Sequence, residues 1–183
     1  FFFYFSVVEV GADLLQVLAR MYWLTKNPKW LAWGIQIGDY YLSEAHLPTR
    51  TLSRLRLRDH GCEIVAGLVE MYAVVHTANS AKKRQWQPYL HEMLNTILAK
   101  GRNEHGLFYG EVNPLTGEVV QKRIADNFGY TLNAFYTVYM LDGISAYRDA
   151  TLKALGSLSA NYRNHDWENG SADGYADAIE GTL

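Results

Sequence analysis

Two acidic residues, Asp59 and Asp126, stand at matching places in the chain, each just before an apolar segment with helical periodicity. Carboxyl groups in such a pair can carry out glycoside hydrolysis, which requires them to lie about 5 to 5.5 Å apart for retention or about 6.5 to 9.5 Å apart for inversion. We therefore predict Asp126 and Asp59 as the catalytic pair. The alternative is that each is a helix N-cap or a first-turn acid, a role that contributes about 1 kcal/mol or less.

Other polar and aromatic side chains stand in the same loops or close to them, and we predict them as substrate-binding residues. Trp167 and Tyr109 can serve as stacking platforms for a sugar ring, since both occur in loops rather than at helical spacing. The full predicted set is His60, Asn127, Arg123, Tyr130, Tyr109, Glu111, His105, Trp167 and Asp173.

A second chemistry fits the same residue types. A lyase needs a base that takes the proton beside a uronate carboxylate and a group that neutralises that carboxylate. His60 or Tyr130 fits the base, and Asn127 or Arg123 fits the neutralising group. An epimerase could use His60 with His105 in two-sided proton transfer. For each histidine the alternative is an ordinary structural role.

The sequence predicts no cofactor and no metal site. The segment His91-Glu92-Met93-Leu94-Asn95 resembles the HExxH zinc motif but has Asn95 where the second histidine ligand is required. The sequence contains no phosphate-binding loop, dinucleotide fingerprint or GxSxG nucleophile elbow.

The elements that must position these residues are helices in a repeated arrangement. Gly11, Asp13 and Met21-Tyr22 recur as Gly61, Glu63 and Met71-Tyr72, at a separation of 61 − 11 = 50 residues. Looser copies begin at residues 126 and 172. Such repetition with two helices per unit indicates a stacked or closed helical array. As the counterpart of Asp13, Glu63 is interpreted as a brace for packing rather than as a catalytic residue.

Apolar periodicity predicts three antiparallel helical hairpins and the start of a fourth. The paired helices span residues 7–26 and 28–44, 59–78 and 82–99, and 127–142 and 145–162, and a fourth inner helix begins at residue 173. The basic loop over residues 46–58 is expected to be a solvated rim or, alternatively, a lip that attracts acidic substrates. Two strand-like runs around residues 113–117 predict one small β-hairpin near residues 107–123.

This pattern resembles the (α/α) toroid of the six-hairpin glycosidase superfamily, which includes glycoside hydrolases and α/α-barrel polysaccharide lyases. Glycine-initiated inner helices, outer helices between them and acidic or histidine-bearing loops before each inner helix carry the resemblance. It implies an all-α fold with that single β-hairpin insert. It also implies that residues 1–183 are one incomplete toroid domain of about three and a half hairpins. The remaining hairpins would come from the rest of the protein or from another chain.

Composition narrows the choice of partner. A net charge of −2 argues against non-specific nucleic-acid binding, and the apolar run at the start is too short to span a membrane. The single cysteine, Cys62, rules out an internal disulfide. We therefore predict a carbohydrate substrate and a glycoside hydrolase that acts on an oligosaccharide, including one with uronic acids. The alternatives are a polysaccharide lyase or sugar epimerase, and a non-catalytic helical-repeat module that binds a glycan or a protein.

Overall fold

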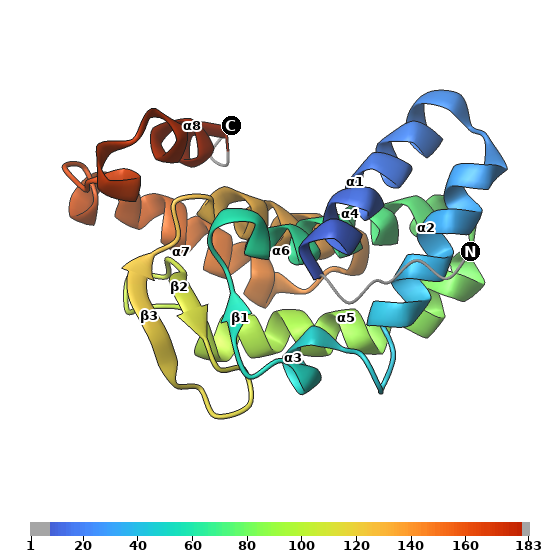
Figure 1. The fold of residues 1–183 in the computed structure, drawn as a ribbon, viewed down its shortest axis with the longest axis horizontal. Coiled ribbons are helices and arrows are strands. Elements are labelled where there is room, and N and C mark those ends of the chain that lie inside the picture. Colours follow the sequence, from blue (N-terminus) through green and yellow to red (C-terminus); the bar gives the residue numbers. More distant parts are fainter. Residues whose placement is uncertain (1–7, 181–183) are drawn as a thin grey trace.

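The computed structural model describes residues 8–180, in which eight α-helices surround a core and a three-stranded antiparallel sheet lies at one side (Figure 1). Helices that contact one another in a row, here called inner helices, alternate along the chain with outer helices that return in the opposite direction. The inner helices are α1 (Val8–Thr25), α4 (Glu63–Ala78), α6 (Phe128–Asp142) and α8 (Ala172–Glu180). The outer helices are α2 (Pro28–Tyr41), α5 (Ser80–Lys100) and α7 (Ser145–Asn161). The prediction of a mainly helical chain is confirmed.

Local sequence sets the ends of these helices. Asn27 accepts a hydrogen bond from the backbone N–H of Lys29 and is followed by Pro28, which suits the first turn of a helix. Asn79 caps α5 in the same way through the N–H of Lys82. Gly143, with φ of 74°, ends α6 in the left-handed conformation that glycine adopts without strain.

Helices α1 and α4 lie side by side and run in the same direction. Arg20 of α1 donates to both carboxylate oxygens of Glu70 on α4, at 3.0 and 2.7 Å, across a separation of 50 residues. Asp13 and Glu63, which have the same separation in sequence, form a hydrogen-bonded pair nearer the helix starts. A constant separation at two places along the helices requires parallel packing, so the sequence repeat corresponds to a repeat in space.

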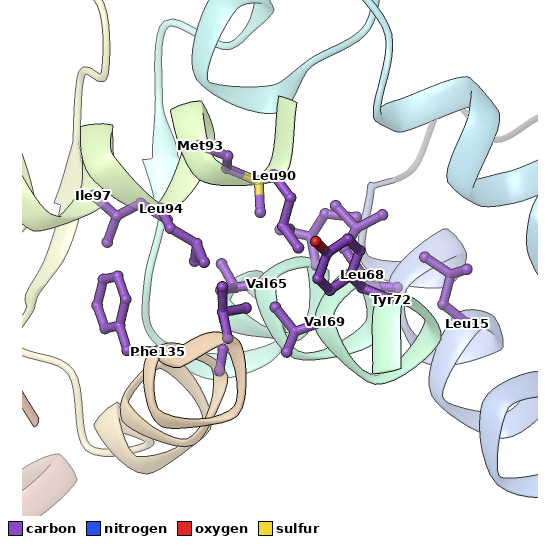
Figure 2. Close-up of a cluster of buried hydrophobic side chains, with 14 of the residues drawn as sticks. Leu15, Val65, Leu68, Val69, Tyr72, Leu90, Met93, Leu94, Ile97 and Phe135 are labelled. Carbon is purple, nitrogen blue, oxygen red and sulfur yellow. The ribbon is translucent and has the colours of Figure 1, made fainter. Parts of the chain in front are cut away.

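Helix α4 is the centre of the core, because it contacts α1, α5 and α6. Figure 2 shows its apolar side chains between Leu15 of α1, Phe135 of α6 and a row of side chains from α5. Together with the preceding 3-10 turn η1 (Asp59–Cys62), α4 is long and apolar enough to cross a membrane by length and composition alone. Within the part of the chain that the structure describes, 67% of that apolar window is buried inside the protein, as is typical of a core helix.

The contact between α1 and α4 depends on Gly67. A Cβ atom at this position would lie 2.4 Å from the carbonyl oxygen of Ala12 and 3.1 Å from Cβ of Leu15. The first of these is a backbone atom, which cannot move aside as the end of a flexible side chain can. The absence of a side chain at Gly67 therefore allows the two helices to approach at backbone distance.

The predicted β-hairpin is present, but it belongs to a larger sheet. Strands β2 (Tyr109–Val112) and β3 (Val119–Ile124) pair with each other, and β1 (Leu55–Arg56) pairs with β2 in the order β1-β2-β3. The expectation of a purely α-helical fold with one hairpin is thus corrected to a mainly helical fold with a three-stranded sheet. The segment predicted as a loop over residues 46–58 contains β1 and the short helix α3 (Pro48–Thr51). A two-residue strand has no periodicity of its own, so it becomes a strand only through its partner.

At the end of α6, a buried carboxylate joins three helices. Asp142 is 1% exposed and accepts hydrogen bonds from Tyr72 (2.8 Å) and His91 (2.7 Å), and Lys83 lies 2.5 Å from its other oxygen. Burial alone raises the pKa of this carboxyl, but the contacts with Lys83, His91 and Tyr72 outweigh burial and lower it. His91, from the incomplete zinc motif, therefore has a structural role in α5.

Replacing Gly67 with alanine is expected to lower the free energy of unfolding by about 1 to 3 kcal/mol, because the added methyl group overpacks the α1–α4 contact. Gly156→Ala is the matched control: Gly156 is exposed on α7, and an added Cβ meets no atom within 4 Å. This control should raise stability by up to about 1 kcal/mol through helix propensity. Urea unfolding of both variants measures the difference, and equal stabilities would contradict the close contact.

Candidate functional site

The starts of α1, α4 and α6 meet at one end of the molecule, here called the mouth. Arg56, just before η1, donates to Glu9 in the first turn of α1 and to Asp59, both at 2.8 Å. The side-chain amide of Asn127, at the start of α6, donates to the backbone carbonyl of Asp59 at 2.6 Å. The structure therefore brings the segments of the two predicted catalytic residues together, with Asn127 as the link.

Asp59 is held in a strained and highly partnered position. Its φ of 47° is in the left-handed region, which costs a residue other than glycine on the order of 1 kcal/mol or more. One carboxylate oxygen accepts hydrogen bonds from Arg56 at 2.8 Å and from Arg58 at 2.5 Å. Two guanidinium groups thus fix this carboxylate at the mouth.

Asp126 lies beneath the surface at the start of α6. It is 4% exposed and accepts a hydrogen bond from the backbone N–H of Asn127 at 3.1 Å. Arg123 of β3 approaches its other carboxylate oxygen at 3.7 Å. His165 lies near both Arg123 and Asp126, and burial lowers its pKa, with the positive charge of Arg123 acting in the same direction. Both effects favour the neutral form of the His165 imidazole.

A second group of titratable side chains at the mouth joins α1 to α4. Glu63 accepts a hydrogen bond from Nδ1 of His60 at 2.9 Å and forms a hydrogen bond with the carboxyl of Asp13. Its Oε2 atom is buried and receives no N–H or O–H from another described group. We call Asp13 and Glu63 the carboxyl pair.

Burial raises the pKa of Glu63 to about 7, and the hydrogen bond to Asp13 contributes in the same direction. His60 opposes this effect but does not cancel it. The hydrogen bond to Glu63 in turn raises the pKa of His60. The side chain of His60 is 75% exposed and Asp13 is also exposed, whereas the side chain of Glu63 is only 17% exposed, so Glu63 is the most enclosed member of this group.

The carboxyl pair was not among the residues predicted to do chemistry, although Glu63 was singled out as a brace. The available signal was the repeat itself, since it aligns Asp13 with Glu63 at the separation that also pairs Arg20 with Glu70. Parallel neighbouring helices at this register must bring the two acids face to face. His165 was also missed, because a lone histidine in a polar loop carries no spacing signal.

Of the predicted binding residues on the sheet, Glu111 is 6% exposed and its carboxylate pairs with Arg54 through two hydrogen bonds of 2.5 and 2.9 Å. That pairing attaches the segment before β1 to β2. Tyr109 is half-buried on the same strand. Asp173 is exposed in the first turn of α8.

The predicted residues Trp167 and His105 lie in an aromatic cluster beside the mouth. Trp167 is 8% exposed, with its ring 5.4 Å from Phe128 and 4.5 Å from His165 between centroids. His105 lies edge-on to Tyr162 at 5.8 Å. Little of Trp167 is open for a sugar ring to stack on, so its principal contact is with the start of α6.

Tyr130 lies in a groove of about 330 Å³ between α1, α4 and α6. The groove has a floor of small residues, among them Ala66 and Gly129, and Trp23 at its edge is 44% exposed. The Arg20–Glu70 ion pair also lines it. The groove runs along the inner helices beyond the mouth.

Neither a metal cluster nor a known relative identifies the site. Within residues 8–180, no group of three or more His, Cys, Asp or Glu side chains could hold a metal ion. Comparison with protein families, with curated proteins and with solved structures finds no match to this chain.

The raised pKa of Glu63 makes the stability of the protein depend on pH. The folded state holds the Glu63 proton up to about pH 7, whereas an ordinary glutamate releases it near 4.5. This contribution to stability is therefore complete below about pH 4.5 and is lost as the pH rises through about 7. His60, whose pKa is also raised, loses its contribution in the same direction. We expect Glu63→Gln to reduce the fall in stability between pH 5 and pH 8.

Urea unfolding of the wild type and Glu63→Gln at the two pH values measures this effect. Glu70→Gln is the matched control, since Glu70 lies on the same helix but pairs with Arg20 outside the carboxyl pair. The assignment of this pH dependence to Glu63 fails if the stability of Glu63→Gln retains the full pH dependence of the wild type while that of Glu70→Gln does not.

Proposed function

We propose that this protein is a glycoside hydrolase that acts on an oligosaccharide at the mouth, with Glu63 as the general acid. The observation that carries the proposal is the carboxyl pair, in which the partly buried Glu63 has a pKa of about 7 beside the exposed Asp13. A general acid must be protonated at the working pH and yet able to release its proton, so a pKa near neutrality is the value that hydrolysis at pH 7 requires.

The second carboxyl group of the reaction is Asp59. Asp13 cannot fill this role, because a carboxyl hydrogen-bonded to Glu63 is closer to it than the roughly 5 Å that even the retaining geometry needs. Asp59 begins the 3-10 turn that leads into α4, and its carboxylate is held at the mouth by ion pairs with Arg56 and Arg58. This assignment retains Asp59 as one member of the predicted catalytic pair. It replaces the other member, Asp126, with Glu63, which acts as the acid. Asp126 then orients Arg123 and the start of α6.

The fold supports this placement as part of an (α/α) toroid. Parallel inner helices in the order α1, α4, α6 and α8, with antiparallel outer helices between them, are the arrangement that such a ring repeats. The N-terminal ends of parallel helices direct unpaired backbone N–H groups to one side, which favours anionic and polar groups there. Further hairpins, from the same protein or from another chain, would close the ring around the mouth.

A second candidate is a lyase or epimerase that acts on a uronic sugar. His165 favours it, since a neutral imidazole close to Arg123 provides a base beside a cation. The exposed His60, predicted as the base, is instead held by Glu63 with a raised pKa, which suits a proton donor.

Activity on a panel of aryl glycosides and neutral and acidic oligosaccharides tests the proposal. Glu63→Gln should lower kcat by about 10²- to 10⁴-fold, the range typical for loss of a general acid, and Glu70→Gln should leave kcat unchanged. Release of reducing sugar without an unsaturated product would distinguish hydrolysis from lyase chemistry. Full activity of Glu63→Gln would overturn the assignment.

Asp13→Asn should move the alkaline limb of the kcat/KM profile to lower pH. Removal of the neighbouring carboxylate makes ionisation of Glu63 easier, so its pKa falls and the active, protonated form is lost earlier as the pH rises. A limb that does not move would show that another group is the acid.

A further inference from the structure

Besides Oε2 of Glu63, four buried polar atoms at the mouth have no hydrogen-bond partner among the described residues. Two are donors, Nε of Arg58 and an Nη2 nitrogen of Arg123, and two are acceptors, Oε1 of Gln121 and Oδ1 of Asn127. Buried polar groups in folded proteins are nearly always paired, since an unpaired one loses its hydration without replacement. Asn127 is only 3% exposed, so water at the surface does not satisfy it.

These atoms belong to one connected group of side chains, here called the polar network. Gln121 and Arg123 are both partly buried on β3, on either side of the exposed Lys122. Gly110 on β2 lies against both sides of this network: a Cβ there would be 2.5 Å from Oε1 of Gln121 and 3.0 Å from Cδ of Arg58. Arg58 continues to Asp59, and Asp59 to Asn127, through the hydrogen bonds described above.

The polar network also reaches the surface. The side chains of Arg58 and Arg123 are each 28% exposed and that of Asp59 is 24% exposed, although the four unpaired atoms are buried. At the far end of the same helices, Oδ1 of Asp142 also lacks a hydrogen bond of ordinary geometry, but Lys83 lies 2.5 Å from it as an ion-pair partner, and Tyr72 and His91 donate to the other oxygen. Unpaired groups that lie just behind a partly open surface are arranged for a ligand that enters from outside.

The balance of donors and acceptors indicates the chemistry of that ligand. A hydroxyl group donates one hydrogen bond and accepts up to two, so two neighbouring hydroxyls can satisfy all four atoms. A carboxylate can only accept, and would leave Gln121 and Asn127 unpaired.

We propose that the polar network is a subsite for a neutral sugar ring, which it holds through two vicinal hydroxyl groups. The inference rests on the proposed function only for the carbohydrate nature of the ligand. It narrows the substrate class to neutral glycans, in contrast to the uronic sugars that Arg123 and Asn127 were first expected to neutralise. Gly110 is part of the subsite, since a side chain there would collide with Gln121 and Arg58 and displace them.

Binding of simple methyl glycosides, measured by NMR titration at pH 7 in the Glu63→Gln background, tests the subsite without turnover. The probes are the methyl glycosides of glucose, galactose, mannose and xylose, with methyl glucuronide as the acidic counterpart of methyl glucoside. We expect at least one neutral glycoside to bind, about tenfold or more tightly than methyl glucuronide. Gln121→Met should weaken that binding by about tenfold, the value of one lost hydrogen bond.

The same substitution should not lower the stability of the free protein, because it removes a buried acceptor that has no protein partner. Lys122→Met is the matched control: Lys122 is exposed on the opposite face of β3, so its replacement should leave the affinity unchanged. A merely structural role for Gln121 would instead give a less stable protein with unchanged affinity.

Three results would overturn the subsite: no neutral glycoside binds, methyl glucuronide binds more tightly than the neutral probes, or Gln121→Met leaves the affinity intact. Failure of the proposed function is a separate outcome. Glycoside binding that depends on Gln121, in a protein that hydrolyses no oligosaccharide, would refute the hydrolase and leave the subsite in place. Hydrolysis that is insensitive to Gln121→Met would refute the subsite and leave the hydrolase in place.

Discussion

The structure depends on the direct contact of two parallel helices, α1 and α4, at Gly67. Because this residue has no side chain, the α4 backbone reaches the carbonyl of Ala12, and that approach fixes the register of the two helices. The register in turn places Asp13 opposite Glu63 and Arg20 opposite Glu70. A packing constraint in the middle of the helices therefore creates the electrostatic arrangement at their starts.

The two ends of the inner helices differ in how many partners they provide for buried charged and polar groups. At the end of α6, Asp142 is surrounded by three donors, and its lowered pKa shows that the charged form is stabilised. At the mouth, burial and the neighbouring Asp13 raise the pKa of Glu63, and the polar network contains donors and acceptors that the protein does not pair. A full set of partners stabilises the fold, whereas an incomplete one leaves interactions available to a substrate. This contrast is the physical reason to place function at the mouth.

The helices and their order could be predicted from the sequence, because long apolar segments with a helical period and capping residues such as Asn27 and Asn79 are strong local signals. The approach of the Asp59 and Asp126 segments followed from the repeat. Strand β1 could not be predicted, since two residues acquire strand geometry only from pairing with β2. The roles of Glu63 and His165 also escaped prediction, because a pKa depends on burial and on neighbours distant in sequence. The sequence shows which acidic residues are present but not which of them become buried away from solvent in the folded protein.

The parallel inner helices have a consequence for how such a protein can change over time. The loops that lead into α4 and α6 arrive at the same rim, so a new side chain in either loop joins a shared surface without disturbing the contact at Gly67. Packing and chemistry are thus encoded in different segments of the chain. A scaffold of this kind can acquire a different specificity by loop substitution alone, while the helices that support it stay the same.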